Sequence, residues 1–171
     1  MKKQGGYSIQ EAQAVLERYC SYQERSHKEV AEKLQKMGMI PEVQEGIILH
    51  LLQHNFLNEE RFAKAFAGGK FRSKKWGKLK ITQALVQKGV SAANIKTGLD
   101  EIDTQDYIRT LKELTKKYLG FTTFNSDKND DEWLLVVKKL PYPEKQKLIR
   151  YLYQKGFETG LIYEYIIKGE V

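Results

Sequence analysis

The residues of this chain with types and spacing suited to metal chemistry are a pair of histidines, His50 and His54. They stand four positions apart and would share one face of a helix, which is the spacing of a zinc-binding helix. The glutamate that a zinc protease carries between them is absent, and no third ligand is evident. The sequence therefore favours two surface histidines over a metal site.

Other catalytic signals are also weak. The stretch from Asp127 to Asp131 imitates the start of a calcium loop, but Glu132 stands where the turn needs glycine and Lys138 where a bidentate glutamate is needed. The sequence contains no phosphate-binding Gly-x-x-x-x-Gly-Lys-Ser/Thr loop and no Gly-x-Ser-x-Gly elbow. We predict a protein that is not an enzyme and that needs no metal or cofactor.

The strongest feature is a binding feature, a basic segment in the middle of the chain. The formal net charge is +7, yet no acidic residue occurs between Glu60 and Asp100. That window holds ten cations: Arg61, Lys64, Lys70, Arg72, Lys74, Lys75, Lys78, Lys80, Lys88 and Lys96. Positive charge confined to one segment creates a local field whose natural partner is a polyanion or an acidic protein surface.

A lysine-rich helix is more often simply a solvated surface, so this alternative has to be weighed. We expect the lysines of the window not to form the i,i+4 ion pairs of a salt-bridged surface helix. The densest part, from Arg72 to Lys80, also surrounds Trp76 and Gly77 at a probable helix junction. Trp76 could stack on a base, anchor a protein interface or point into the core, and the sequence leaves these three roles open.

Composition limits the class of protein. With 171 residues, 41% of them hydrophobic and 30% charged, the chain is long enough to bury a core as one domain or two small ones. Its longest apolar runs are far too short to span a bilayer, and Met1-Lys2-Lys3 is not followed by the apolar segment of a secretory signal. Cys20 stands alone, so no disulfide can form within the chain. We expect a cytoplasmic protein and a buried Cys20.

Apolar spacing predicts helices nearly throughout. Ser8 with Glu11 and then Ser26 indicate helix starts, and Pro41 starts a third helix. A helix carrying Phe62 and Phe66 is expected to end near Gly68-Gly69. Further helices are expected from about Leu79 to Gly89, from Ser91 to Ile102, from Thr104 to Tyr118, from Glu132 to Leu140, up to Gly156, and from about Leu161 to Ile166.

An internal repeat runs through this pattern. The motif Leu-x-x-x-Gly-apolar ends at Gly38, Gly89 and Gly156, with an apolar residue ten positions after each glycine. Each glycine is predicted to be the left-handed C-cap between the second and third helices of a repeat. We predict an all-α, elongated and curved array of three three-helix repeats: residues 8–57, residues 58–103 with the basic segment, and residues 104–171 with a polar insertion at about 119–143.

Three stretches of the sequence resemble the central signature of the RecX family, whose members are bacterial regulators of the RecA recombinase. These are Glu59-Glu-Arg-Phe-Ala-Lys-Ala-Phe66, Gly77-Lys-Leu-Lys-Ile81 after the basic stretch, and Leu85-Val-Gln-Lys-Gly-Val90. The stretch from Lys145 to Phe157 is similar to the family's C-terminal repeat. The chain between Leu119 and Pro143 departs from the pattern, and Gly68-Gly69 replaces bulkier residues.

This resemblance implies a function as well as a fold. Members of the family bind RecA, or its filament on single-stranded DNA, and suppress its ATPase, strand-exchange and coprotease activities, and some bind DNA directly. The resemblance thus implies a regulator of DNA repair, homologous recombination and the SOS response. We expect a monomer, although the sequence does not give the oligomeric state. For contacts with RecA or DNA our candidates are Lys70, Arg72, Lys74, Lys75, Trp76, Lys78, Lys80 and Lys88.

Two other functions stay open at this stage. The helices around Gly89 could form a helix-turn-helix that reads duplex DNA, although the helix after Gly89 has only one cation, Lys96. A helical-repeat scaffold for acidic proteins is the other possibility. The salt dependence of DNA binding separates these functions in part. If five of the cations neutralise single-strand phosphates, log K should fall with log salt at a slope of about −3.5. A scaffold for proteins would not bind DNA, and a sequence reader would discriminate between duplexes.

Overall fold

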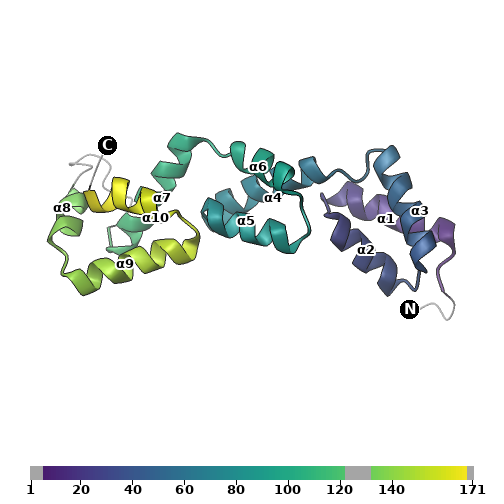
Figure 1. Cartoon of the computed structure of the whole chain (residues 1–171), viewed down its shortest axis with the longest axis horizontal. Coiled ribbons are helices and arrows are strands. Elements are labelled where there is room, and N and C mark those ends of the chain that lie inside the picture. The colour runs from purple at the N-terminus through teal and green to yellow at the C-terminus, as the bar shows by residue number, and fades with distance from the viewer. Residues whose placement is uncertain (1–5, 122–131, 169–171) are drawn as a thin grey trace. The chain divides into compact units, whose positions relative to one another are not determined.

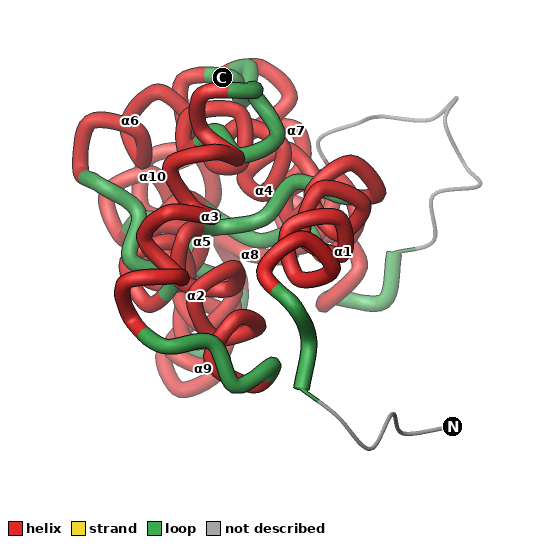
Figure 2. Tube along the Cα trace, turned by 90° about the vertical axis from the view of Figure 1, so that its right-hand side faces the viewer, coloured by secondary structure: helices red, strands yellow, loops and turns green. Residues whose placement is uncertain are grey.

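The computed structural model describes residues 6–121 and 132–168, and within these ranges every regular element is a helix (Figure 1 and Figure 2). The prediction of an all-α fold is confirmed. The stretch that imitates a calcium loop, Asp127–Asp131, lies outside the described residues. The helices are α1 (Ile9–Tyr22), α2 (His27–Lys36), α3 (Pro41–Gln53), α4 (Glu59–Lys74), α5 (Lys78–Gln87), α6 (Ala92–Asp100), α7 (Thr104–Tyr118), α8 (Glu132–Lys139), α9 (Tyr142–Lys155), α10 (Thr159–Ile162) and the π-helical η1 (Tyr163–Lys168).

Local capping chemistry explains why these helices begin where they do. Ser8 and Ser26 each form a complete capping box, with Glu11 and Glu29 respectively. In both boxes the hydroxyl accepts the N3 backbone N–H while the glutamate accepts the cap's own N–H, so two unpaired donors are satisfied. The α7 helix begins in a related way, because the carboxylate of Asp103 accepts the N–H of Asp106.

Three glycines share one geometry at helix ends. Gly38, Gly89 and Gly156 have φ angles of +78°, +75° and +96°. In each case the glycine and the residue after it donate their N–H groups back to the last turn of the helix, as in Met39 N–H to Leu34 O and Phe157 N–H to Leu152 O. This is the Schellman motif, which needs a left-handed residue and therefore favours glycine.

The prediction that the helix of Phe62 and Phe66 ends near Gly68-Gly69 is wrong, because α4 continues to Lys74. A glycine inside a helix costs about 1 kcal/mol relative to alanine. Burial outweighs this cost here, since Ala67 and Phe71 on either side of the pair are both buried. The helix is instead followed by Lys75, a non-glycine residue with a φ angle of +54°.

Contacts divide the chain into two compact units, residues 1–67 with 84–99 and residues 68–83 with 100–171. In the first unit, α1, α2 and α3 enclose a core that includes Leu16, Leu34 and Leu51. In the second unit, the ring of Tyr107 lies 4.9 Å from that of Phe157 and 5.9 Å from that of Phe71. Both α4 and α5 contribute residues to both units. The boundaries proposed for the three repeats stay a prediction.

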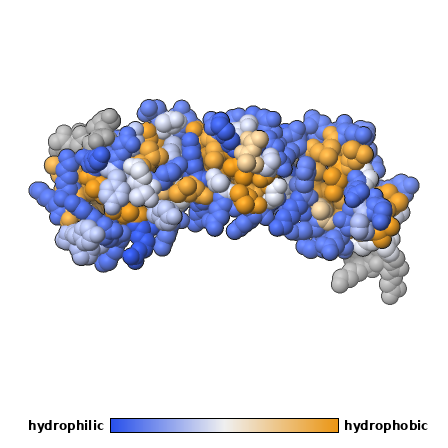
Figure 3. Space-filling model, viewed as in Figure 1, coloured by the Kyte–Doolittle hydropathy of each residue, from blue (hydrophilic) through white to orange (hydrophobic). Residues whose placement is uncertain are grey.

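Hydrophilic residues cover most of the face shown in Figure 3, with apolar residues gathered in separate patches between them. Within the described residues, no helix is both long and apolar enough to cross a membrane.

Candidate functional site

The candidate site is the basic turn, which we define as residues 70–80 between the last turn of α4 and the first turn of α5. Arg72, Lys74 and Lys75 are exposed there. Among the described residues, none of these three side chains has a carboxylate partner. Cations at the C-terminal end of a helix are favoured by its dipole, so α4 tolerates this concentration of charge. The turn thus presents three cations to solvent.

Trp76 lies at the centre of the basic turn and is half-buried. The ammonium groups of Lys70 and Lys80 lie 5.4 Å and 5.0 Å from the centroid of its ring. Both distances are within the range of a cation–π interaction. Trp76 is thus partly buried and has charged groups beside its ring.

The backbone of the basic turn is held by the C-terminal end of α9. The N–H of Gly77 donates to the carbonyl of Lys155 at 2.8 Å, and the N–H of Leu79 donates to the carbonyl of Gly156 at 3.0 Å. The side chain of Lys80 also donates to the carbonyl of Gln154 at 3.2 Å. Unpaired N–H groups at the start of α5 thus meet unpaired carbonyls at the end of α9, and each helix terminus satisfies the other.

This docking requires two glycines. A Cβ added to Gly77 would lie 2.2 Å from the carbonyl carbon and oxygen of Gly156. A Cβ added to Gly156 would lie 2.4 Å from the Cβ of Lys80. Both distances are shorter than any real contact, so the two backbones approach more closely than a side chain at either position would permit.

Tyr107 supports the same turn from α7. Its hydroxyl accepts the N–H of Lys78 at 2.8 Å and donates to Glu158 Oε2 at 2.7 Å. The ammonium of Lys78 lies 5.1 Å from the centroid of the same ring. Burial raises the pKa of Tyr107 well above its ordinary value; the bond from Lys78 opposes this rise, and Glu158 adds to it. The hydroxyl consequently stays protonated and keeps donating to Glu158.

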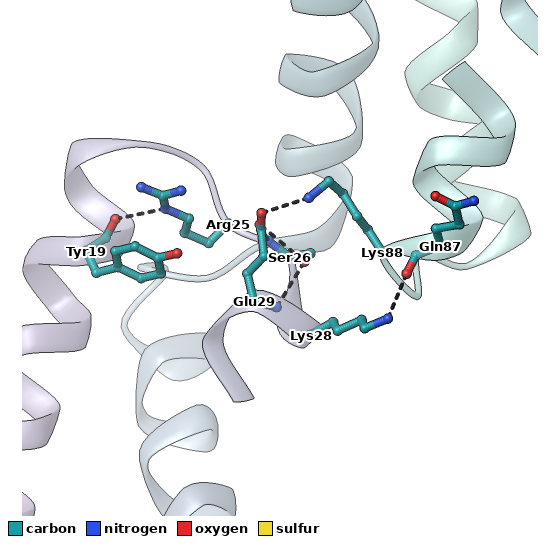
Figure 4. Close-up of polar contacts among 7 residues, drawn as sticks. All are labelled: Tyr19, Arg25, Ser26, Lys28, Glu29, Gln87 and Lys88. Atoms are coloured by element: carbon teal, nitrogen blue, oxygen red, sulfur yellow. Dashed lines mark hydrogen bonds and ion pairs between the residues drawn. The ribbon is translucent and has the colours of Figure 1, made fainter. Parts of the chain in front are cut away.

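Lys88, the remaining candidate, is in the other unit and is paired (Figure 4). Its ammonium lies 2.8 Å from Glu29 Oε1, and the ammonium of Lys28 donates to the carbonyl of Gln87 at 3.0 Å. Burial alone would raise the pKa of Glu29, but hydrogen bonds from Lys88 and Ser26 lower it overall. Lys88 thus links the end of α5 to the start of α2, while the other candidates gather in the basic turn.

The expectation that the lysines of the basic window form no i,i+4 ion pair is wrong. Lys64 does form an i,i+4 pair, with Glu60 at 3.0 Å. Glu60 lies just outside the window that has no acidic residue, and for that reason the window alone does not reveal the pair. Arg61 is also paired, with its Nε 2.5 Å from Glu24 Oε1 and its Nη atoms donating to the side chain and carbonyl of Asn55.

The acidic start of the signature has a structural role. Glu59 Oε2 accepts from the hydroxyl of Ser91 at 2.6 Å and from the amide of Asn94 at 2.5 Å. Glu59 at the start of α4 is therefore bonded to the start of α6, and the side chains of Ser91 and Asn94 already have a hydrogen-bond partner within the protein.

The two histidines are engaged with other side chains. Nε2 of His50 lies 2.7 Å from Glu17 Oε1 and 3.0 Å from the amide of Gln13, while the rings of His50 and His54 lie 4.1 Å apart. Nowhere in residues 6–121 or 132–168 do three His, Cys, Asp or Glu residues form a group that could hold a metal ion. Cys20 is buried, and burial raises the pKa of its thiol to about 11.

Comparison with known proteins finds similarity to one family. Residues 58–99 match the family model for the second three-helix domain of RecX, and residues 136–166 match the model for the third. The regulatory protein RecX of Lactobacillus johnsonii is 29% identical, over 90% of this chain and 72% of that protein. The regulatory protein RecX of Clostridium perfringens (strain 13) is 33% identical, over 78% of this chain and 57% of that protein.

Solved structures support the same fold. The crystal structure of RecX from Lactobacillus salivarius has a TM-score of 0.74 at 21% identity, and the match covers 95% of this chain and 96% of that one. At this identity the match concerns the fold alone. The family models and the curated relatives carry the comparison further: they support a protein of the RecX family of regulatory proteins.

Proposed function

We propose that this protein regulates the RecA recombinase, mainly as an inhibitor. It binds RecA or the RecA filament on single-stranded DNA and suppresses the ATPase, strand-exchange and coprotease activities of RecA. Its effects on DNA repair and the SOS response follow from that binding. Similarity to a family of regulatory proteins supports a regulatory role, and the basic turn supports the kind of partner.

One observation carries the proposal. Arg72, Lys74 and Lys75 are exposed and lack carboxylate partners among the described residues, while nearby cations such as Arg61 and Lys88 are paired. Unpaired, exposed cations on a turn whose backbone is hydrogen-bonded are suited to a polyanion or an acidic protein surface, because the backbone loses little conformational entropy on binding.

The direct test is single-strand-dependent ATP hydrolysis by the cognate RecA, titrated with this protein at amounts well below the nucleotide-site concentration of the DNA. We expect strong inhibition at substoichiometric amounts, which simple competition for DNA would not produce. Absence of inhibition even at excess would contradict the proposed function.

A pair of variants tests the site. Reversing three charges (Arg72→Glu, Lys74→Glu, Lys75→Glu) should raise the concentration needed for half-inhibition at least about tenfold, if each lost contact is worth about 0.5–1 kcal/mol.

The matched control reverses Lys117, Lys138 and Lys139, which are also exposed and also belong to the second unit. Both variants have the same net charge, so a general charge effect would weaken them equally. Equal inhibition by the two folded variants would show that the basic turn is not the contact.

A further inference from the structure

The surroundings of Trp76 indicate which kind of ligand it contacts. Two ammonium groups lie within 5.4 Å of its ring centroid, one from Lys70 at the end of α4 and one from Lys80 in α5. The backbone N–H of Trp76 is directed at the carbonyl of Lys70, 3.5 Å away, and its neighbour Gly77 is bonded to α9. The backbone that carries the ring is therefore held by hydrogen bonds, and the ring is flanked by cations.

This environment argues against an apolar protein interface. Covering the ring with apolar side chains would also desolvate the ammonium of Lys80, whose hydrogen-bond partner is the neutral carbonyl of Gln154. Desolvating a charge without bringing an anion to it costs several kcal/mol. Trp76 is partly exposed, in contrast to Trp133, which is only 3% exposed.

A nucleotide of single-stranded DNA offers a partner both to the ring and to the two ammonium groups. Its base offers a π face to the indole, and its phosphates offer acceptors to the ammonium groups. Lysine is a flexible point charge, so the ammonium groups of Lys70 and Lys80 can exchange their present contacts, which for Lys80 include the carbonyl of Gln154, for the phosphate when a base occupies the ring face. In duplex DNA the base faces are already stacked, which leaves single strands as the matching ligand.

We infer that Trp76 is a base-stacking residue for single-stranded DNA, with the ammonium groups of Lys70 and Lys80 neutralising the phosphates beside the stacked base. The inference rests on the proposed function, because it names the part of a nucleoprotein filament that the basic turn touches. Stacking on one aromatic residue tolerates any base, so the site has no marked sequence preference.

The test uses this protein without RecA and a labelled oligo-dT strand of about fifteen nucleotides, with an abasic strand of equal length as the phosphate-only probe. We expect the oligo-dT strand to quench the fluorescence of Trp76 on binding, because a stacked base contacts the indole. Binding of the abasic strand should be weaker and should leave the fluorescence unchanged. The buried Trp133 supplies a constant background in both titrations.

Substitutions separate stacking from charge. Trp76→Ala should weaken oligo-dT binding roughly 5- to 150-fold, as expected for loss of one stacked base, whereas Trp76→Phe should largely retain affinity while losing the quenching. Tyr142→Ala removes an aromatic side chain that is 75% exposed at the other end of α9, and it should leave affinity unchanged. Circular dichroism of each variant checks that it is folded.

Three results would overturn the inference: equal affinity for the two strands, binding of oligo-dT without quenching, or a folded Trp76→Ala variant with unchanged affinity. None of these depends on RecA. If any of them occurs while the wild-type protein still inhibits RecA, the proposed function stands and the stacking role of Trp76 fails. If stacking is found but RecA is not inhibited, the proposed function is the part that fails.

Discussion

Replacing Gly156 by alanine should undock the basic turn from α9. Two costs add at this position. The φ angle of +96° is a left-handed conformation that costs an alanine about 1–2 kcal/mol. The new Cβ would also lie 2.4 Å from the Cβ of Lys80 and 2.7 Å from its backbone nitrogen, so the start of α5 must move away.

That movement weakens the two backbone hydrogen bonds donated by Gly77 and Leu79, each worth about 0.5–1.5 kcal/mol. The expected loss in the free energy of unfolding is therefore about 2–5 kcal/mol. Urea denaturation followed by tryptophan fluorescence measures it, because Trp76 and Trp133 both belong to the second unit.

The chain offers controls that separate the two costs. Gly120 has a φ angle of +82° and open space around its Cβ position, so Gly120→Ala carries only the backbone cost of about 1–2 kcal/mol. Gly77 has no positive φ angle but the same close contact, so Gly77→Ala carries only the clash. If Gly156→Ala proves no more destabilising than Gly120→Ala, the close approach of α5 and α9 does not contribute to stability and the reasoning is wrong.

Three further outcomes follow from buried or paired groups. Tyr107→Phe should lower the free energy of unfolding by about 1–3 kcal/mol in the same urea assay, since it leaves Glu158 and one backbone N–H without their partner. The pKa of Glu29 is lower in the folded state, so its pair with Lys88 should stabilise the folded state above the unfolded-state pKa. This contribution should be lost as pH falls through the lower folded-state pKa. In thermal melts from about pH 7 to about pH 3, the melting temperature of Glu29→Gln should therefore decrease less than that of the wild-type protein. Cys20 should react with a thiol reagent at about pH 8 only after denaturant is added, and rapid labelling of the native protein would contradict its burial.

Features encoded by nearby residues can be predicted from the sequence. The capping box of Ser8 and Glu11 lies within four residues, and Gly38, Gly89 and Gly156 each lie within two residues of the end of their own helix. Such signals do not depend on the rest of the fold. Helix starts and the all-α class are therefore accessible from the amino-acid sequence alone.

Features that depend on distant residues cannot be predicted in this way. The sequence pattern misplaces the end of α4 because Phe71 packs against Tyr107, a residue far along the chain, and this burial overrides two glycines. The partner of Lys88, Glu29, is 59 residues away in sequence, and the hydroxyl that accepts the N–H of Lys78 is 29 residues away. Nothing in the local pattern of a basic segment distinguishes a paired lysine from an unpaired one.

The difference between paired and unpaired lysines decides which residues of the basic segment can be substituted to test binding. Substituting Lys88 would break its pair with Glu29 and leave that half-buried carboxylate unpaired, which changes stability as well as charge. Lys78 and Lys80 also make contacts within the protein, with the ring of Tyr107 and the carbonyl of Gln154.

A variant that reverses such residues together with the exposed ones would lose binding for two reasons at once, and its phenotype would not identify the contact surface. The side chains of Arg72, Lys74 and Lys75 form no hydrogen bond or ion pair with the rest of the described chain. Reversing charge at these three positions therefore removes no such contact. The unfavourable effect on the helix dipole at Arg72 and Lys74 is matched in the control by Lys117, Lys138 and Lys139, so a difference in inhibition between the two folded variants would report binding.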